Sequence, residues 1–264
     1  MIATGDGQEG AARPVAGVPT ELPPVPAAVR RVARGARLRP VWRNELGGLT
    51  YELVDAREGR RFLKWAPAGS GLDLAAEAAR LRWAADRTAV PRVLDVGSDP
   101  DGEWLLTAVL PGSSAVDPRW TARPATAVRA LGEGLRHLHD ALPVRDCPFS
   151  WSVGDRLRKA ASRGRPAGRD PGPWLDAAPP VDRLVVCHGD ACSPNTLLDD
   201  AGRVSGHVDL GALGVADRWA DLAVATWSTV WNYGPGWEGV LLEGYGVDLD
   251  PVRTDFYRAL WDAT

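Results

Sequence analysis

Apolar and polar positions alternate in the first part of the chain and follow a helical period in the rest. Short alternating runs occupy residues 41–43, 51–54, 61–65, 91–96 and 103–110. Alternation of this kind is the pattern of half-buried β-strands, and Glu58-Gly59 supplies a turn between the second and third runs. Beyond about residue 110, apolar side chains recur every three or four positions, which is typical of amphipathic helices. This order predicts an α+β fold with two lobes and a cleft between them.

The helical period predicts one helix inside the strand-rich part and several beyond it. Residues 72–87 have helical spacing, and residues 125–142 form a strongly amphipathic stretch. Further helices are expected over residues 25–36, 153–161, 216–227 and 251–262, and one from about residue 238. Residues 1–24 are rich in Gly, Ala and Pro and lack periodicity, so we expect a flexible tail there. We therefore divide the chain into this tail (1–24), a β-rich N-lobe (25–110) and a helical C-lobe (111–264).

Composition limits the partners that the chain can have. Its 264 residues are 45% hydrophobic and 25% charged, which is enough for two lobes with a real core. A formal net charge of −3 gives no global basic field, so we expect no nucleic-acid partner. Neither an apolar run of about 18 residues nor a signal-peptide pattern occurs, so we expect no membrane partner. Three cysteines without a C-x-x-C pair suit a cytoplasmic protein with reduced thiols, which could be a monomer or a dimer.

One stretch carries residues suited to phosphoryl transfer. An apolar run at 184–187 predicts a buried strand that ends in His188-Gly189-Asp190, and Asn195 follows Asp190 by five residues. A second predicted strand, 204–208, is followed by Asp209. A kinase places its base Asp, a metal-binding Asn and a metal-binding Asp in this order, because the reaction needs Mg²⁺ on oxygen ligands and a carboxylate near the acceptor hydroxyl. Turn capping would explain each residue alone, but not all three together.

Two further positions fit the nucleotide side of such a site. Only two of the 31 basic residues are lysines, Lys64 and Lys159. Lys64 lies on the third predicted strand, where kinases place the lysine that binds the α- and β-phosphates. Glu77 follows on the predicted helix and could pair with the compact ammonium group, which an Arg would not replace. An exposed helix carboxylate is the plain alternative for Glu77.

The remaining nucleotide contacts would come from the backbone. Gly47-Gly48 in the first predicted turn would let the main chain approach phosphate closely, although a hairpin turn alone also explains the pair. Thr50 follows this turn, and we group it with the nucleotide contacts. Val109 lies at the end of the strand-rich part, where a hinge would meet the nucleobase through its main chain. A backbone contact does not distinguish ATP from GTP.

These motifs resemble the aminoglycoside O-phosphotransferase family, which has the protein-kinase-like fold. The resemblance rests on residues 185–190, 194–195, 208–211 and 214–223, and on shorter matches from about residue 40 to the C-terminus. It implies Asp190 as catalytic base, Asn195 and Asp209 as Mg²⁺ ligands, and Lys64 with Glu77 on the triphosphate of ATP or GTP. It further implies that Asp217 and Asp221 brace the catalytic loop. The expected acceptor is a small-molecule antibiotic, by family an aminoglycoside, so that phosphorylation confers resistance.

The acceptor side departs from the family pattern. Ala212 stands where the 3′-enzymes usually have Arg, and Trp261-Asp262 takes the place of an acidic C-terminal pair. Residues 155–169 carry six basic side chains and one acidic, whereas the family segment is acidic. Each unfavourable contact with an ammonium group would cost about 1–4 kcal/mol at ~4 Å. Our candidate acceptor contacts are Trp231, Trp261, Asp262 and Arg156.

Several functions therefore stay open at this point. A nucleoside antibiotic of the capuramycin type is the alternative acceptor that a basic loop would favour. The arginines could equally face solvent or bind nucleotide phosphate. Another small-molecule kinase or a protein kinase is a further alternative. Only seven residues separate Asp209 from Asp217-Arg218, too few for a long activation segment, which speaks against the protein kinase. A non-catalytic nucleotide-binding module is disfavoured because the set of residues needed for catalysis is complete: Lys64, Glu77, Asp190, Asn195 and Asp209.

Overall fold

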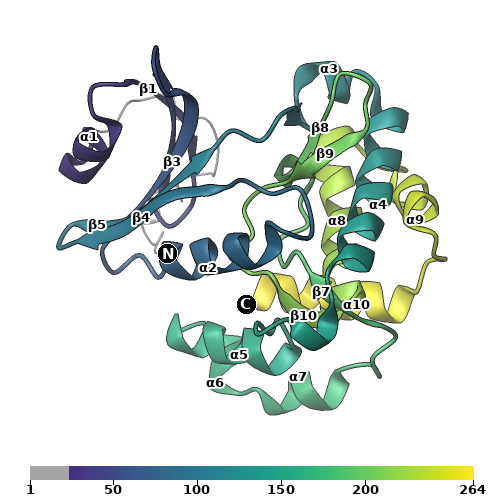
Figure 1. Ribbon diagram of the computed structural model, residues 1–264. Helices are drawn as coiled ribbons and strands as arrows, with labels where there is room; N and C mark the ends of the chain where they lie inside the picture. The colour runs from purple at the N-terminus through teal and green to yellow at the C-terminus, as the bar shows by residue number, and fades with distance from the viewer. Residues whose placement is uncertain (1–23) are drawn as a thin grey trace, which may run out of the picture.

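The computed structural model describes residues 24–264, in which a five-stranded sheet with two helices adjoins a larger, mainly helical part (Figure 1). The predicted tail lies, except for Pro24, outside the described residues. All neighbouring strands of the sheet are antiparallel, in the order β1-β2-β3-β5-β4. Their bounds are β1 Arg37–Arg43, β2 Leu49–Asp55, β3 Gly59–Pro67, β4 Val93–Asp99 and β5 Gly102–Ala108.

The first strand is longer than the sequence predicted. It begins at Arg37 rather than at residue 41, and it includes Pro40. Proline lacks a backbone N–H, but β1 is an edge strand that pairs only with β2, so the missing donor is tolerated. The register shifts between Pro40 and Trp42, which places an irregularity at the proline. Helix α1 (Ala27–Ala33) is correspondingly shorter than the predicted 25–36.

Alternation along β3 separates the two faces of the sheet. Leu63 is fully buried in a core that also contains Val29 and Ala33 of α1. Because successive side chains on a strand point to opposite faces, Lys64 points to the other face. Helix α2 (Leu74–Ala84) carries Glu77, whose side chain meets Lys64 on that face.

The helical part is built around α4 (Pro124–Ala141), which packs against α9 (Glu238–Tyr245). The two helices lie close because Gly132 has no side chain: a Cβ there would lie 2.1 Å from Leu241 O. The other helices are α3 (Pro118–Thr121), α5 (Val153–Ser162), α6 (Pro166–Arg169), α7 (Gly172–Ala177), α8 (Trp219–Tyr233) and α10 (Pro251–Ala263). One continuous core joins this part to α2 (Figure 1).

Short strands deliver the loops between these helices. Strand β7 (Leu184–Cys187) has the predicted bounds and pairs with β10 (Gly214–Asp217). A three-stranded sheet consists of β6 (Ser113–Ser114), β8 (Thr196–Leu198) and β9 (Val204–His207). The helix predicted over 216–227 is shifted, since residues 214–217 pair with β7 and α8 begins only at Trp219 and continues to Tyr233. Single-turn 3-10 helices occur at Val144–Asp146 and Ser193–Asn195.

Within residues 24–264, none of the helices combines the length and the apolar character needed to cross a bilayer. The three cysteines are free, and Cys187 is fully buried in the core as expected.

Candidate active site

Lys64 joins three segments that are distant in sequence. Its Nζ donates to Glu77 Oε1 at 2.7 Å and to Asp209 Oδ1 at 2.9 Å. Strand β3, helix α2 and the loop after β9 therefore meet at one ammonium group. Glu77 is 5% exposed, so it is a buried partner rather than a solvated helix residue.

The charges at this junction stabilise one another. Burial would lower the pKa of Lys64, but the carboxylates of Asp209 and Glu77 outweigh that effect and raise it. The Lys64 charge in turn lowers the pKa of Asp209 below its ordinary value. At neutral pH the ammonium group and the Asp209 carboxylate are both ionised.

Asp190 and Asn195 lie together on the neighbouring loop. Asn195 Nδ2 donates to the main-chain oxygen of Asp190 at 3.0 Å. Asp190 Oδ1 is buried and accepts no hydrogen bond from residues 24–264. Burial and the nearby charge of Asp209 raise the pKa of Asp190, while the side chains of Cys192 and Asn195 partly oppose the shift. The loop thus holds a carboxylate with an unused acceptor oxygen.

A second close approach brings the two loops together. Gly189 has a φ of +83°, and a Cβ at this position would lie 2.2 Å from Ala212 O. Only glycine satisfies both the backbone conformation and the contact. Asp209, three residues before Ala212, itself has a φ of +64°. Asp190 and Asp209 are therefore positioned relative to each other through main-chain packing.

Asp221 supports the first of these loops. Its carboxylate accepts from His188 N at 2.5 Å and from Gly189 N at 2.9 Å, and His139 Nε2 lies 3.0 Å away. Asp217 has another role, since it accepts from Asp182 N and Trp219 N. Only Asp221 contacts the loop that both residues were expected to brace.

One further group of potential ligands lies in this support. The ligand atoms of His139, Cys187 and Asp221 all lie within 4.8 Å of one another. Both Asp221 oxygens already accept backbone hydrogen bonds, and His139 Nδ1 lies 2.8 Å from the Tyr245 hydroxyl. These hydrogen bonds account for the positions of His139 and Asp221 in the cluster.

The residues expected to contact nucleotide through the backbone lie on the same sheet. Thr50 is the cross-strand partner of Lys64, and Val109 directly follows β5. Gly47 takes a positive φ of +83° in the β1–β2 turn. A Cβ on Gly48 would lie 2.6 Å from Asn44 Nδ2, so a larger residue there would displace the Asn44 side chain.

Of the four acceptor candidates, Arg156 has the most unexpected environment. It is 1% exposed and lies near the rings of Trp151 and Trp261, at 5.2 and 5.8 Å from their centroids. Nη2 donates to Thr264 Oγ1 at 3.2 Å, whereas Nε and Nη1 have no partner among the described residues. Burial lowers the pKa of Arg156 to about 10. This guanidinium therefore packs between α5 and α10 and is not an exposed basic group.

Other arginines of residues 155–169 are also committed to main-chain oxygens. Arg165 donates to Asp262 O and Ala263 O at the end of α10, at 2.7 and 3.3 Å. Arg163 donates to Gly71 O at 3.0 Å, across to the segment before α2. Arg156, Arg163 and Arg165 are therefore held inside the fold or against main-chain oxygens, so the count of charges alone does not show a basic wall against a cationic acceptor.

The remaining candidates differ in exposure. Trp231 on α8 is 53% exposed, and its ring lies 5.0 Å from that of Trp227. Asp262 is exposed on α10, whereas Trp261 beside it is partly covered by Arg156. Among the described residues, no ring contact joins Trp231 to Trp261, although α8 and α10 pack against each other.

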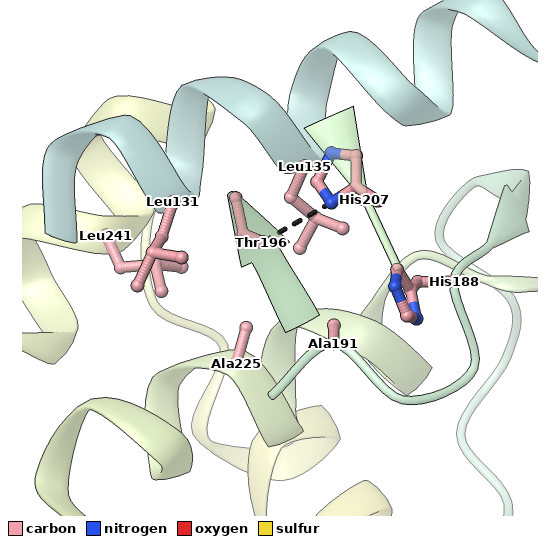
Figure 2. A pocket seen from close by; sticks show the side chains of 8 residues that line it. All are labelled: Leu131, Leu135, His188, Ala191, Thr196, His207, Ala225 and Leu241. Carbon is pink, nitrogen blue, oxygen red and sulfur yellow. Dashed lines mark hydrogen bonds between the residues drawn. The ribbon is translucent and has the colours of Figure 1, made fainter. Parts of the chain in front are cut away.

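A small cavity lies between α4 and the segment that carries His188 and Ala191, as Figure 2 shows. Its volume of about 10 Å³ is close to that of one water probe, so it cannot hold a substrate. Leu131 and Leu135 of α4 border it, together with His188 and His207. Burial, reinforced by the charge of His188, lowers the pKa of His207 to about 3, so this ring is neutral.

Two residues that support the loops were not recognised as such in the sequence. Arg80 of α2 donates from Nε to Leu213 O at 2.9 Å and so holds the segment after Asp209. Ser228 Oγ of α8 accepts from Ser193 N at 2.8 Å. Arg80 falls within a motif that resembles the family, but nothing in the sequence singles out Ser228.

Comparison with known proteins agrees with this geometry. The model of a phosphotransferase enzyme family matches residues 43–257. An aminoglycoside 3′-phosphotransferase of Streptomyces fradiae is 35% identical over 242 residues, which cover 81% of this chain and 90% of the relative.

Solved structures show the same fold. An aminoglycoside 3′-phosphotransferase of type VIII matches with a TM-score of 0.75 and 30% identity over 90% of this chain and 97% of its own. APH(3″)-Id of Streptomyces rimosus in complex with ADP and streptomycin matches with a TM-score of 0.67 and 29% identity, over 88% and 94% of the two chains. These likenesses confirm the predicted fold class, two-lobed and protein-kinase-like.

Proposed function

Because the chain belongs to the phosphotransferase enzyme family, we propose that it moves the γ-phosphoryl group of ATP or GTP to a hydroxyl of an aminoglycoside and so confers resistance. The observation that carries this proposal is the convergence of Glu77 and Asp209 on Lys64, next to the loop of Asp190. A nucleoside triphosphate is a cytoplasmic metabolite, so we place the reaction in the cytoplasm. We divide the chain functionally into an N-lobe (25–110) and a C-lobe (111–264).

The N-lobe would bind the donor. Lys64, held by Glu77, would meet the triphosphate with a full positive charge, which compensates the phosphate oxygens. Gly47, Gly48 and Thr50 lie at the turn and strand beside Lys64, and we assign them to the phosphates. The main chain of Val109 would contact the nucleobase.

Asn195 and Asp209 would hold Mg²⁺. Their side-chain oxygens are of the hard type that Mg²⁺ prefers. The charge of Asp209 raises the pKa of Asp190, so negative charge is concentrated where a divalent cation would reduce the repulsion. When bound, Mg²⁺ neutralises charge on the transferred phosphates.

Asp190 would act as the base. Its Oδ1 is an acceptor without a partner in residues 24–264, and its raised pKa makes the carboxylate a better proton acceptor. The acceptor O–H proton passes to Asp190, the acceptor oxygen bonds to the γ-phosphorus, and the bond from that phosphorus to the bridging oxygen breaks. Asp221 would keep the loop in register for this transfer.

The acceptor would be bound by aromatic and acidic groups. The exposed ring of Trp231 offers a surface for a sugar ring, and the exposed carboxylate of Asp262 could pair with an ammonium group. Arg156 would act indirectly, by packing against Trp261. The names of the relatives, an aminoglycoside 3′-phosphotransferase and a streptomycin 3″-kinase among them, favour an aminoglycoside over the nucleoside antibiotic.

The test measures nucleotide consumption with ATP or GTP and a panel of acceptors. Kanamycin and streptomycin should be phosphorylated, whereas a capuramycin-type nucleoside and a protein substrate should not. Asp190→Asn should lower kcat by about 10²–10⁴-fold with little change in KM for nucleotide. Asp200→Asn is the matched control, because that side chain is 96% exposed. Turnover of Asp190→Asn close to that of the control would refute the assignment.

A further inference from the structure

A second cavity lies in the N-lobe on the face opposite Lys64. It has a volume of about 480 Å³, within the range of small-molecule sites. Trp104 and Leu106 of β5 line it, and both belong to the core that packs against α1. Arg61 of β3 also lines it and is three residues before Lys64, so the two side chains point to opposite faces of the strand. This cavity is therefore separate from the proposed nucleotide site.

Basic side chains outnumber acidic ones around this cavity. Arg31, Arg34 and Arg61 line it, against Glu58 and Asp95. The two carboxylates are engaged, since Glu58 forms an ion pair with Arg61 and Asp95 Oδ2 accepts from Trp104 Nε1 at 3.0 Å.

Two of the arginines keep unused binding capacity. Arg34 ends α1 in a left-handed conformation with φ of 48° and forms no ion pair within residues 24–264. Arg61 is only 8% exposed, and its buried Nε has no hydrogen-bond partner in that range. A buried donor without an acceptor costs free energy, so the Arg61 side chain would gain by turning Nε toward an acceptor in the cavity.

The apolar part of the lining sets the shape of the ligand. Leu94, Trp104 and Leu106 supply flat hydrophobic surface beside the arginines. Arg31 already covers the ring of Trp104, with its guanidinium 5.2 Å from the ring centroid, and pairs with Asp99 at 2.9 Å. A ligand with an aromatic ring against this surface and an anionic group toward Arg61 would match both the apolar and the basic part of the lining.

We propose that this cavity is a binding site for a small aromatic carboxylate. Its carboxylate lies against the guanidinium groups of Arg34 and Arg61, and its ring packs against Leu94 and Leu106. The site does not depend on which acceptor the enzyme phosphorylates. Because Arg61 and Lys64 share β3, ATP and this ligand bind to opposite faces of one strand without competing.

Calorimetric titration with salicylate tests the proposal on the full-length protein, with and without saturating ATP. Salicylate should bind with one-to-one stoichiometry, and saturating ATP should not raise its Kd. Arg61→Met and Arg34→Ala should each weaken binding by about tenfold or more. Arg57→Ala, which removes a charge from the same hairpin outside the cavity, should leave the Kd unchanged.

Three outcomes would overturn the site. One is no heat of binding up to about 10 mM salicylate. Another is competition with ATP, which would place salicylate in the nucleotide site. The third is an unchanged Kd in the exposed Arg34→Ala variant, which is informative even if Arg61→Met fails to fold. Inorganic phosphate should bind more weakly than salicylate, and equal affinity would refute the role of the apolar wall.

Discussion

Replacing Gly189 with alanine should disrupt the relation between the two acidic loops of the active site. Gly189 has a φ of +83°, and an added Cβ would lie 2.2 Å from Ala212 O and 2.5 Å from Ala212 C. Gly189 immediately precedes Asp190, and Ala212 follows Asp209 by three residues. The clash therefore falls between the segments that carry the two carboxylates.

The size of the effect follows from two contributions. A left-handed conformation costs an L-residue about 1–2 kcal/mol relative to glycine. Contacts between carbon and carbonyl oxygen lie at about 3.3 Å, so the loops must move apart by about 1 Å. A misplacement of about 1 Å at a catalytic group can cost on the order of 10²-fold in rate. Gly189→Ala should thus lower kcat by about two orders of magnitude and also lower the Tm.

Gly59→Ala separates the two contributions. Gly59 has a similar φ of +72°, but an added Cβ there would meet nothing within 4 Å. Thermal unfolding and steady-state phosphorylation should show a lower Tm for both variants and a loss of kcat for Gly189→Ala alone. If Gly189→Ala matched Gly59→Ala in both measurements, the close approach would not position the carboxylates.

Three further substitutions test buried charges and loop supports. Burial lowers the pKa of His207 from 6.5 to about 3, so below pH ~6.5 the unfolded chain binds one proton more than the folded chain. The free energy of unfolding therefore falls by about 1.4 kcal/mol per pH unit as the pH drops below ~6.5. In urea unfolding, His207→Gln should show a weaker dependence of this free energy on pH. Arg156→Met should leave the Tm unchanged or raise it, because removing a buried guanidinium with two unpartnered nitrogens is often neutral or stabilising by about 1–4 kcal/mol. Arg80→Met should lower kcat by about tenfold in steady-state assays, because it removes a charged hydrogen bond to Leu213 O worth about 1.5–3 kcal/mol.

Exposed residues provide the controls for these variants. Arg158→Met should leave the Tm unchanged, and Arg82→Met should leave kcat unchanged. A slope for His207→Gln equal to that of the parent protein would show that His207 does not titrate with unfolding. A Tm loss in Arg156→Met as large as that of a typical core truncation would show that the contacts of Arg156 stabilise the fold by more than the burial of its charge costs.

Local patterns predicted those elements whose pairing partners are close in sequence or whose apolar period is long. Alternation along residues 61–65 placed Leu63 and Lys64 on opposite faces, as observed. The strand at 184–187 also has the predicted bounds. Strand β10 was missed because Gly214–Asp217 lacks the unbroken apolar run that marks its partner β7, which lies 27 or more residues earlier. Such pairing depends on tertiary contacts that a local pattern does not contain.

Charge counts in the sequence were a poor guide to the acceptor site. The basic residues of 155–169 suggested a surface that repels cations, but Arg163 and Arg165 bind main-chain oxygens and Arg156 is buried. Arg165 meets carbonyl oxygens at the end of α10 that the helix leaves unpaired, where a cation is favourable. The field at a site is therefore set by where its charges lie and by what surrounds them, which is visible only in three dimensions.

The two sides of the active site consequently differ in how far a sequence can specify them. Phosphate and a divalent cation require particular groups, which we propose to be Lys64, Asn195 and Asp209, so the chemistry restricts residue type and the short loops restrict spacing. An acceptor built of sugar rings can be bound by any exposed aromatic or acidic side chain that reaches it, from α8, α10 or elsewhere. The Gly189–Ala212 contact is required neither by phosphate and metal binding nor by acceptor binding, since it acts through main-chain shape alone. Because Ala212 contributes its backbone there, the loss of an Arg side chain at this position can alter acceptor binding without disturbing the distance between Asp190 and Asp209.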